Sequence, residues 1–300
     1  EFYWLNDRKN PEVIDYLNKE NDYYNQETEH TKTFQEDLFQ EMKLRIKKND
    51  TSVPYKFNGY WYTTRYEKGK DYPIYTRKKE SLDSNEEILF DCNVMAKDHS
   101  YFRLVGLNVS PNNQYVSYGV DTTGRRQYKL LIKDIKSNKV FKEEVWNTTG
   151  GSIWANDNKT LFYVLKDETT LRSEAVYKHR LNTSTENDEL VYEEKDDTFG
   201  VGIYKTKSQK YLVISSYSTL TSEHKILNAN TPDGIFKVFQ SRVKGLEYSI
   251  SHFENSFYIV SNIDNSQNFK LSKTSEKNTE KNNWIDVIPH RENVLLEGID

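Results

Sequence analysis

Five short apolar runs decide the fold of this chain: YWYTT at residues 60–64, YVSYG at 115–119, LFYVL at 161–165, YLVIS at 211–215 and FYIVS at 257–261. Aromatic and β-branched side chains dominate the runs, which is typical of β-strands. Successive runs begin 55, 46, 50 and 46 residues apart. A repeat of about 40–50 residues indicates the blades of a β-propeller.

Other strand-like segments recur at matching places around each run. Turn sequences precede the last four runs: NVSPNN at 108–113, IWANDN at 153–158, YKTKSQ at 204–209 and SHFENS at 251–256. A further strand follows each run across a polar loop, at residues 74–75, 131–132, 176–177, 226–227 and 271. A last one comes at 88–90, 140–141, 190–192, 236–239 and 284–288. This four-strand superperiod separates a propeller from a β-sandwich.

We therefore predict an all-β fold, a β-propeller of about five blades with four antiparallel strands each, over residues 51–300. The segment VLLEG at 294–298 is predicted to begin a sixth blade. The propeller domain is thus expected to be incomplete, with an unclosed ring and an open sheet edge.

Residues 1–50 form a separate segment with two predicted α-helices. Asn10 followed by Pro11 fits an N-cap and the first helical position. A second helix is expected near Thr33, where the sequence TFQE fits a capping box. Its apolar residues recur every four positions: Phe34, Leu38, Met42 and Ile46. We expect both helices to pack on a core.

Composition excludes several classes of protein. The net charge of −4 provides no basic field for nucleic acid. No apolar stretch approaches the roughly 18 residues of a membrane span. The single cysteine, Cys92, excludes an intrachain disulfide and has no assigned role. A cytoplasmic location is favoured, but the chain begins with Glu1 rather than Met, so a missing natural N-terminus leaves the periplasm open.

Candidate catalytic patterns are absent or weak. The serine turn G-x-S-x-G of hydrolases does not occur. Asp98, His99 and Ser100 are neighbours in sequence, but a triad must converge in space. The histidines at positions 30, 99, 179, 224, 252 and 290 lack metal-ligand spacing. We therefore predict no catalytic, cofactor-binding or metal-binding residue in this chain.

Two charged motifs have more ordinary interpretations. The acidic run at residues 193–197 is expected to be a solvated loop face. Arg125 and Arg126, beside the turn residue Gly124, are expected to pair across strands or to contact a neighbouring domain. Two other functions stay open for such a propeller. One is a stand-alone binding or scaffold module, and the other is a glycosidase with paired carboxylates in the central funnel.

At several of these motifs the sequence resembles the oligopeptidase B branch of the prolyl oligopeptidase family of serine peptidases. The matching stretches run in order along the chain: WLNDRKNPEV at 4–13, YLNKEN at 16–21, GYWYTTRYEKGKDYPIYTRK at 59–78, VSPNNQ at 109–114, DTTGRRQY at 121–128, EEKDDTF at 193–199, EYSISHF at 247–253 and VIPHRENVLLEG at 287–298. This resemblance implies an N-terminal helical segment, a seven-bladed propeller and a C-terminal α/β-hydrolase domain.

The resemblance also implies how these parts work. The helical segment packs on the hydrolase domain, which holds the triad and the acidic residues that select Arg or Lys. The propeller restricts the active site to short peptides. About two blades and the hydrolase domain are expected to be missing from this chain. We therefore expect residues 1–300 to be inactive alone, with short Arg- or Lys-containing peptides and the missing hydrolase domain as partners.

Overall fold

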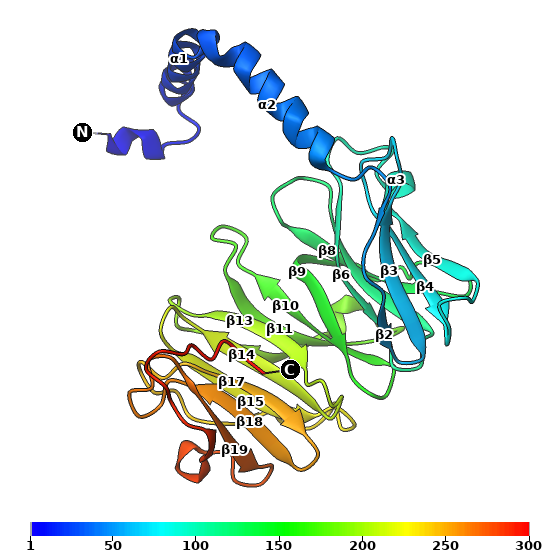
Figure 1. Cartoon of the computed structure of the whole chain (residues 1–300), viewed down its shortest axis with the longest axis vertical. Helices are drawn as coiled ribbons and strands as arrows, with labels where there is room; N and C mark the ends of the chain where they lie inside the picture. Colours follow the sequence, from blue (N-terminus) through cyan, green and yellow to red (C-terminus); the bar gives the residue numbers. More distant parts are fainter. Residues whose placement is uncertain (1, 300) are drawn as a thin grey trace.

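The computed structural model describes residues 2–299, and its β-sheets follow one another along a curved path (Figure 1). Two helices extend away from one end of the first sheet, α1 (Pro11–Glu27) and α2 (Lys32–Arg45). The remaining helical pieces are short: η1 (Tyr3–Asn6), η2 (Glu29–Thr31), α3 (Cys92–Met95), η3 (Thr185–Asn187) and η4 (Lys281–Asn283). The described chain is therefore mostly β, as the sequence predicts.

The strands of residues 2–299 form four hydrogen-bonded sheets in chain order. The first contains β1 (Asp50–Thr51), β2 (Tyr55–Phe57), β3 (Tyr60–Tyr66), β4 (Ile74–Lys79) and β5 (Glu86–Asp91). The second contains β6 (Arg103–Val109), β7 (Tyr115–Asp121), β8 (Tyr128–Asp134), β9 (Val145–Trp154), β10 (Thr160–Lys166), β11 (Ser173–Arg180) and β12 (Glu189–Glu193). The third contains β13 (Gly200–Lys205), β14 (Tyr211–Tyr217), β15 (Ser222–Asn228) and β16 (Lys237–Val238). The fourth contains β17 (Tyr248–Phe253), β18 (Ser256–Ser261), β19 (Lys270–Ser275) and β20 (Ile285–Ile288).

The five apolar runs of the sequence lie in β3, β7, β10, β14 and β18, and each pairs with antiparallel strands on both sides. Their centres are buried, and Phe162, Leu212, Ile214, Phe257 and Ile259 are fully so. Burial of these side chains, at roughly 25 cal/mol per Å² of apolar surface, is the main stabilisation of the sheets.

The second and third predicted units share one sheet, which the sequence pattern does not anticipate. β9 is ten residues long, and its first half pairs with β8 through Thr148 and Val145. Its second half pairs with β10, so one strand connects both units. The strand predicted at 140–141 is only a single bridge, Lys133 to Val140, beyond the part of β8 that pairs with β9.

The recurring turn sequences have a common backbone conformation. One residue in each turn takes a left-handed φ of 53–62°: Asn113, Asn158, Gln209 and Glu254. Such values are uncommon outside glycine, and asparagine tolerates them better than most residues. The repeat in the sequence therefore reflects a repeated hairpin geometry as well as repeated strands.

The N-terminal helices differ from the prediction in two ways. Asn10 caps α1 as predicted, because its side chain accepts a hydrogen bond from Glu12 N at 3.0 Å. The capping box at Thr33 is wrong: α2 begins at Lys32, and its N-cap Thr31 makes no side-chain cap bond. Packing on a core is also not observed, since Val13 alone is buried among the residues of α1 and α2.

The segment 294–298 forms no strand, in contrast to the prediction. A strand needs a partner along its length. Here the Leu296 N–H meets the carbonyl of Asn268 at 2.9 Å, and Val294 N–H bonds locally to Arg291. The apolar run at the start of this segment is therefore not accompanied by strand pairing within residues 2–299.

No helix among residues 2–299 is long and apolar enough to cross a membrane.

Candidate functional site

The adjacent residues Asp98, His99 and Ser100 are all exposed. The His99 ring stacks on Phe102, with centroids 6.1 Å apart. No hydrogen bond or ion pair links any two of these three side chains within residues 2–299. The other histidines are equally separate, and residues 2–299 contain no group of three potential metal ligands.

A serine, a histidine and a carboxylate do converge elsewhere, at Ser208, His252 and Glu276. The Ser208 Oγ lies 2.9 Å from His252 Nδ1, and Glu276 Oε1 lies 2.6 Å from His252 Nε2. No local signal in the sequence marks this set, because its members are 44 and 24 residues apart and carry no motif.

The Ser208–His252–Glu276 set connects the third and fourth sheets. The His252 ring is 1% exposed and packs beside the rings of Tyr211 and Phe257. Burial lowers the pKa of His252, against the opposing effect of Glu276. Partial burial acts to raise the pKa of Glu276, but hydrogen bonds from Lys210 and His252 lower it overall. A cavity of about 810 Å³ is lined by Ser208 and His252, but Lys210 as well as His252 holds the Glu276 carboxylate. We therefore interpret the set as a polar contact between sheets, since a nucleophilic triad also needs oxyanion donors placed around a reacting carbonyl.

The acidic run 193–197 is only partly a solvated face. Four of its residues are exposed, but Glu194 is buried and pairs with Arg242 at 2.5 Å. The Arg242 guanidinium also lies 3.7 Å from the centre of the Phe199 ring. Burial acts to raise the pKa of Glu194, yet the hydrogen bonds from Arg242 and Tyr192 lower it to about 2. This pair therefore joins the second and third sheets.

The exposed arginines at 125 and 126 do not pair across strands. The Arg126 N–H donates to Asp121 Oδ2 at 2.7 Å, which fixes the turn. Their guanidinium groups make no ion pair within residues 2–299, so of the two predicted roles contact with a neighbouring domain stays a prediction.

A cavity of about 660 Å³ lies where the inner ends of the first three sheets meet, and we call it the Lys205 cavity. The lining is largely apolar or aromatic, and it is formed by Tyr55, Phe57, Asn58, Tyr62, Leu107, Asn108, Val109, Pro111, Ile153, Trp154, Asn156, Tyr204, Lys205 and Gln209. None of these residues is Asp or Glu, so the cavity lacks the carboxylate pair of a glycosidase.

Lys205 is the one cation among the lining residues. Its Nζ donates to Asn156 Oδ1 at 2.9 Å. Two hydrogen bonds orient the Asn156 side-chain amide. Its Nδ2 donates to the Gln209 carbonyl at 3.0 Å and to Asn230 Oδ1 at 2.9 Å. No carboxylate within residues 2–299 forms an ion pair with Lys205, and burial lowers the pKa of its ammonium to about 8.

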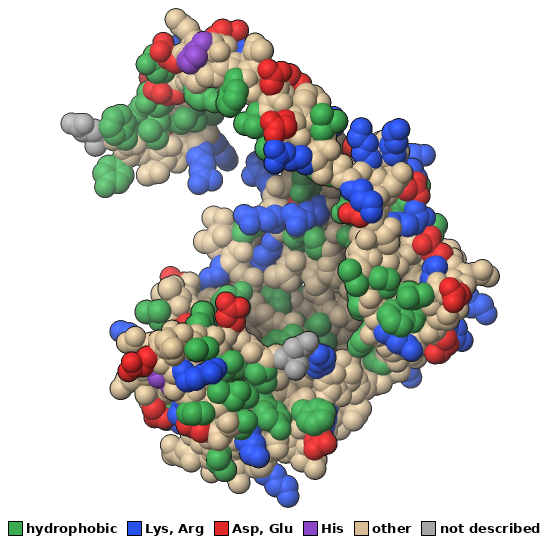
Figure 2. All heavy atoms as spheres, viewed as in Figure 1, with side chains coloured by type: hydrophobic (Ala, Val, Ile, Leu, Met, Phe, Trp, Pro, Cys, Tyr) green, Lys and Arg blue, Asp and Glu red, His purple; other side chains and the backbone are tan. Residues whose placement is uncertain are grey.

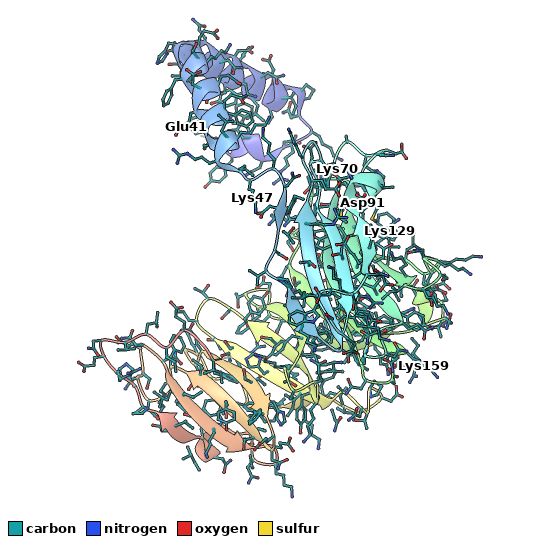
Figure 3. The ribbon with its side chains drawn as sticks, turned by 45° about the vertical axis from the view of Figure 1, so that its right-hand side comes forward. Glu41, Lys47, Lys70, Asp91, Lys129 and Lys159 are labelled. Carbon is teal, nitrogen blue, oxygen red and sulfur yellow. The ribbon has the colours of Figure 1, made fainter. Side chains whose placement is uncertain are left out.

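The position of the cavity along the sheets follows from the turn that contains Asn156, because Figure 3 labels another residue of that turn. Asn156 belongs to the turn between β9 and β10, as does Lys159. Lys159 lies at the opposite end of the sheets from Lys70 and Asp91, which face the side with α1 and α2. The cavity therefore lies at the end of the sheets far from the N-terminal helices.

The curved row of antiparallel sheets and the two preceding helices match a known domain along the whole chain. The sequence model of the family described as prolyl oligopeptidase, N-terminal β-propeller domain, matches residues 1–300. The chain belongs to the prolyl oligopeptidase family. The resemblance predicted from the sequence is thus confirmed.

Similar proteins of this family are peptidases by name. Dipeptidyl aminopeptidase BI of Pseudoxanthomonas mexicana is 36% identical over 100% of this chain and 44% of its own length. Protease 2 of Moraxella lacunata is 29% identical over 99% of this chain and 45% of its own length. The structure of oligopeptidase B from Leishmania major has a TM-score of 0.90 and 28% identity, and the match covers 99% of this chain and 42% of that one.

The chain therefore spans less than half the length of these prolyl oligopeptidase relatives.

Proposed function

We propose that this chain is the propeller portion of a serine oligopeptidase and that it controls which peptides reach the active site. The observation that carries the proposal is the match of all 300 residues to the family's propeller domain. The curved sheets also border a hollow at the centre of the molecule, as Figure 2 shows. A hollow scaffold whose converged Ser208–His252–Glu276 set lies in the contact between two sheets fits a gate better than a catalyst.

In the proposed parent enzyme the chemistry is acyl transfer. A serine attacks the peptide carbonyl, a histidine moves the proton, an aspartate orients the histidine, and backbone amides bind the oxyanion. We place these groups in a hydrolase domain outside residues 1–300. Cleavage after Arg or Lys is proposed from the resemblance to oligopeptidase B, because acidic side chains pair well with those cations.

The N-terminal helices are proposed to dock on that hydrolase domain. Their apolar side chains are exposed here: Phe34 by 67%, Phe39 by 51% and Met42 by 53%. Apolar surface of this extent is typical of an interface. The helices extend away from the sheets, so they are free to meet another domain (Figure 1).

A second candidate is removal of dipeptides from free N-termini. It is favoured by one observation, the name of the Pseudoxanthomonas relative, which is a dipeptidyl aminopeptidase. The two activities differ in whether the substrate needs a free amino group, so substrates distinguish them directly.

The test uses the protein together with whatever coding sequence follows residue 300. Fluorogenic amides ending in Arg, Lys, Pro or Ala are compared, each with a free and a blocked N-terminus. We expect cleavage of blocked Arg and Lys amides and loss of activity with a serine-directed inhibitor. Cleavage of free-amine dipeptides alone would favour the second candidate.

Access control needs a separate measurement. The same Arg-containing sequence is offered as a short peptide, as a peptide of about 60 residues, and within a folded protein loop. We expect cleavage of the short peptide only. Equal cleavage of all three substrates would contradict gating, whatever the cleavage specificity.

A further inference from the structure

The Lys205 cavity contains a half-buried cation without a charged partner among residues 2–299. An ammonium removed from water is costly unless an opposite charge compensates it. Asn156 supplies an oriented amide oxygen, which offers a dipole but no net charge. The Asp157 carboxylate makes no ion pair with Lys205. Its charge acts from a longer distance and opposes the lowering of the Lys205 pKa. The Lys205 ammonium is thus held by an amide oxygen and lacks a charged partner, which suits a ligand with negative charge.

A stacked pair of tyrosines forms part of the cavity lining. Tyr62 is 5% exposed, and its hydroxyl is enclosed beside the Arg77 guanidinium, so the ring is what Tyr62 presents to the cavity. Its ring stacks on Tyr55, with centroids 5.3 Å apart. This part of the lining thus offers an aromatic surface to a bound side chain.

The rest of the lining indicates what kind of anion fits. Aromatic and aliphatic side chains predominate, and there is one cation and no arginine. A phosphate dianion is usually held by several donors or by a guanidinium fork. A single ammonium in an apolar cavity suits a monoanion that is attached to an apolar body.

We propose that the Lys205 cavity binds a carboxylate of a peptide, with Lys205 as the charge partner and the Tyr55 and Tyr62 rings against the adjoining apolar side chain. This proposal rests on the proposed function and deepens it, because it names how the propeller holds its peptide. The carboxylate comes from the C-terminus or from an Asp or Glu side chain. When the carboxylate is bound at this end of the sheets, the rest of the peptide extends into the central hollow.

Calorimetric titration of the intact chain at pH 7 tests this proposal with three blocked peptides. They are acetyl-Gly-Gly-Phe as the free acid, the same peptide as its C-terminal amide, and acetyl-Gly-Glu-Phe as the amide. We expect the acid to bind at least about tenfold more tightly than the plain amide, which corresponds to about 1.4 kcal/mol. Tight binding of the Glu amide as well would show that a side-chain carboxylate also serves.

Two lysine variants separate a specific contact from general charge. Lys205→Met is expected to abolish the preference for carboxylates. Lys159→Met removes an exposed lysine at the same end of the sheets and is expected to leave the preference intact. Equal binding of acid and amide by the unaltered chain, or an unchanged preference in Lys205→Met, would overturn the proposal.

A measurement on the unaltered chain covers the case in which Lys205→Met does not fold. Reductive methylation followed by mass spectrometry reports the accessibility of each lysine. The peptide acid should protect Lys205 several-fold, the plain amide should not, and Lys159 should react equally throughout. Equal methylation of Lys205 with acid and amide would contradict the proposal, while size selection by the extended protein would still stand independently.

Discussion

A single buried ion pair illustrates how much one residue contributes here. Glu194 is 4% exposed, and Arg242 holds it across the contact between the second and third sheets. Glu194→Gln takes the nearest carboxylate from the half-buried Arg242 guanidinium and leaves it Glu223, 3.9 Å away. The substitution should therefore lower the free energy of unfolding by about 2 kcal/mol at pH 7, as for the loss of a charged hydrogen bond. Urea unfolding measures this, and Glu193→Gln, an exposed neighbour, should change it by less than about 0.5 kcal/mol.

The same pair predicts a pH dependence. The pKa of Glu194 is lowered to about 2 in the folded chain, against 4.5 ordinarily. Its stabilisation is complete above pH 4.5 and is lost as the pH falls from 4.5 toward 2. The difference in stability between the natural chain and Glu194→Gln should shrink over this range. A constant difference from pH 7 to pH 3 would show that the carboxylate charge is not responsible.

Cys92 gives a second prediction at this scale. Its side chain is buried, and burial raises the pKa of the thiol to about 12. The thiolate is the reactive form. A thiol reagent at pH 8 should therefore modify the folded chain at least 100-fold more slowly than the chain in denaturant. Rapid modification of the folded chain would contradict the burial of this thiol.

Individual site residues were hard to predict from the sequence for a physical reason. Lys205 and Tyr62 are brought to one cavity by different sheets, and neither belongs to a spacing motif. Glu194 lies in an acidic run whose other members are exposed, so composition gave no sign of its burial. Such roles depend on which strands become neighbours, and that information is not local.

Strand β9 contains a glycine, Gly150, at which a side chain does not fit. Gly150 has a φ of +89°, and a Cβ there would lie 2.4 Å from Val105 Cγ2 and 2.8 Å from the Tyr128 ring. Gly151, its neighbour, has open space around it. Gly150→Ala should destabilise the chain by about 2–4 kcal/mol through backbone strain and overpacking. Gly151→Ala is the matched control and should cost less than about 1 kcal/mol in thermal or urea unfolding.

The N-terminal helices give another prediction. Val13 alone is buried in α1 and α2, and the pair extends away from the sheets (Figure 1). Deleting residues 1–46 should therefore shift the melting midpoint of the sheets by less than about 2 °C. A fall of 5 °C or more would show that the helices stabilise the sheets.

Elements were largely predictable because their signals are local. The five apolar runs mark β3, β7, β10, β14 and β18, and the N-cap at Asn10 marks the start of α1. The sharing of β9 between two units was not predictable, because a ten-residue strand can bend at Gly150 and pair on both sides. The predicted strand at 294–298 failed because pairing needs a partner that no local pattern specifies.

At the scale of the whole molecule, the chain has the family's propeller domain and less than half the length of its peptidase relatives. Within residues 2–299 one serine, one histidine and one carboxylate converge, and they form a polar contact between two sheets. The central claim is that this portion selects substrate and performs no cleavage itself.

Hydrolysis of a blocked Arg-ending fluorogenic amide by the purified chain of residues 1–300 tests this claim most directly. We expect the rate of hydrolysis to equal the rate in buffer alone, both for the natural chain and for Ser208→Ala. Turnover by the natural chain that a serine-directed inhibitor stops, and that Ser208→Ala lacks, would contradict it.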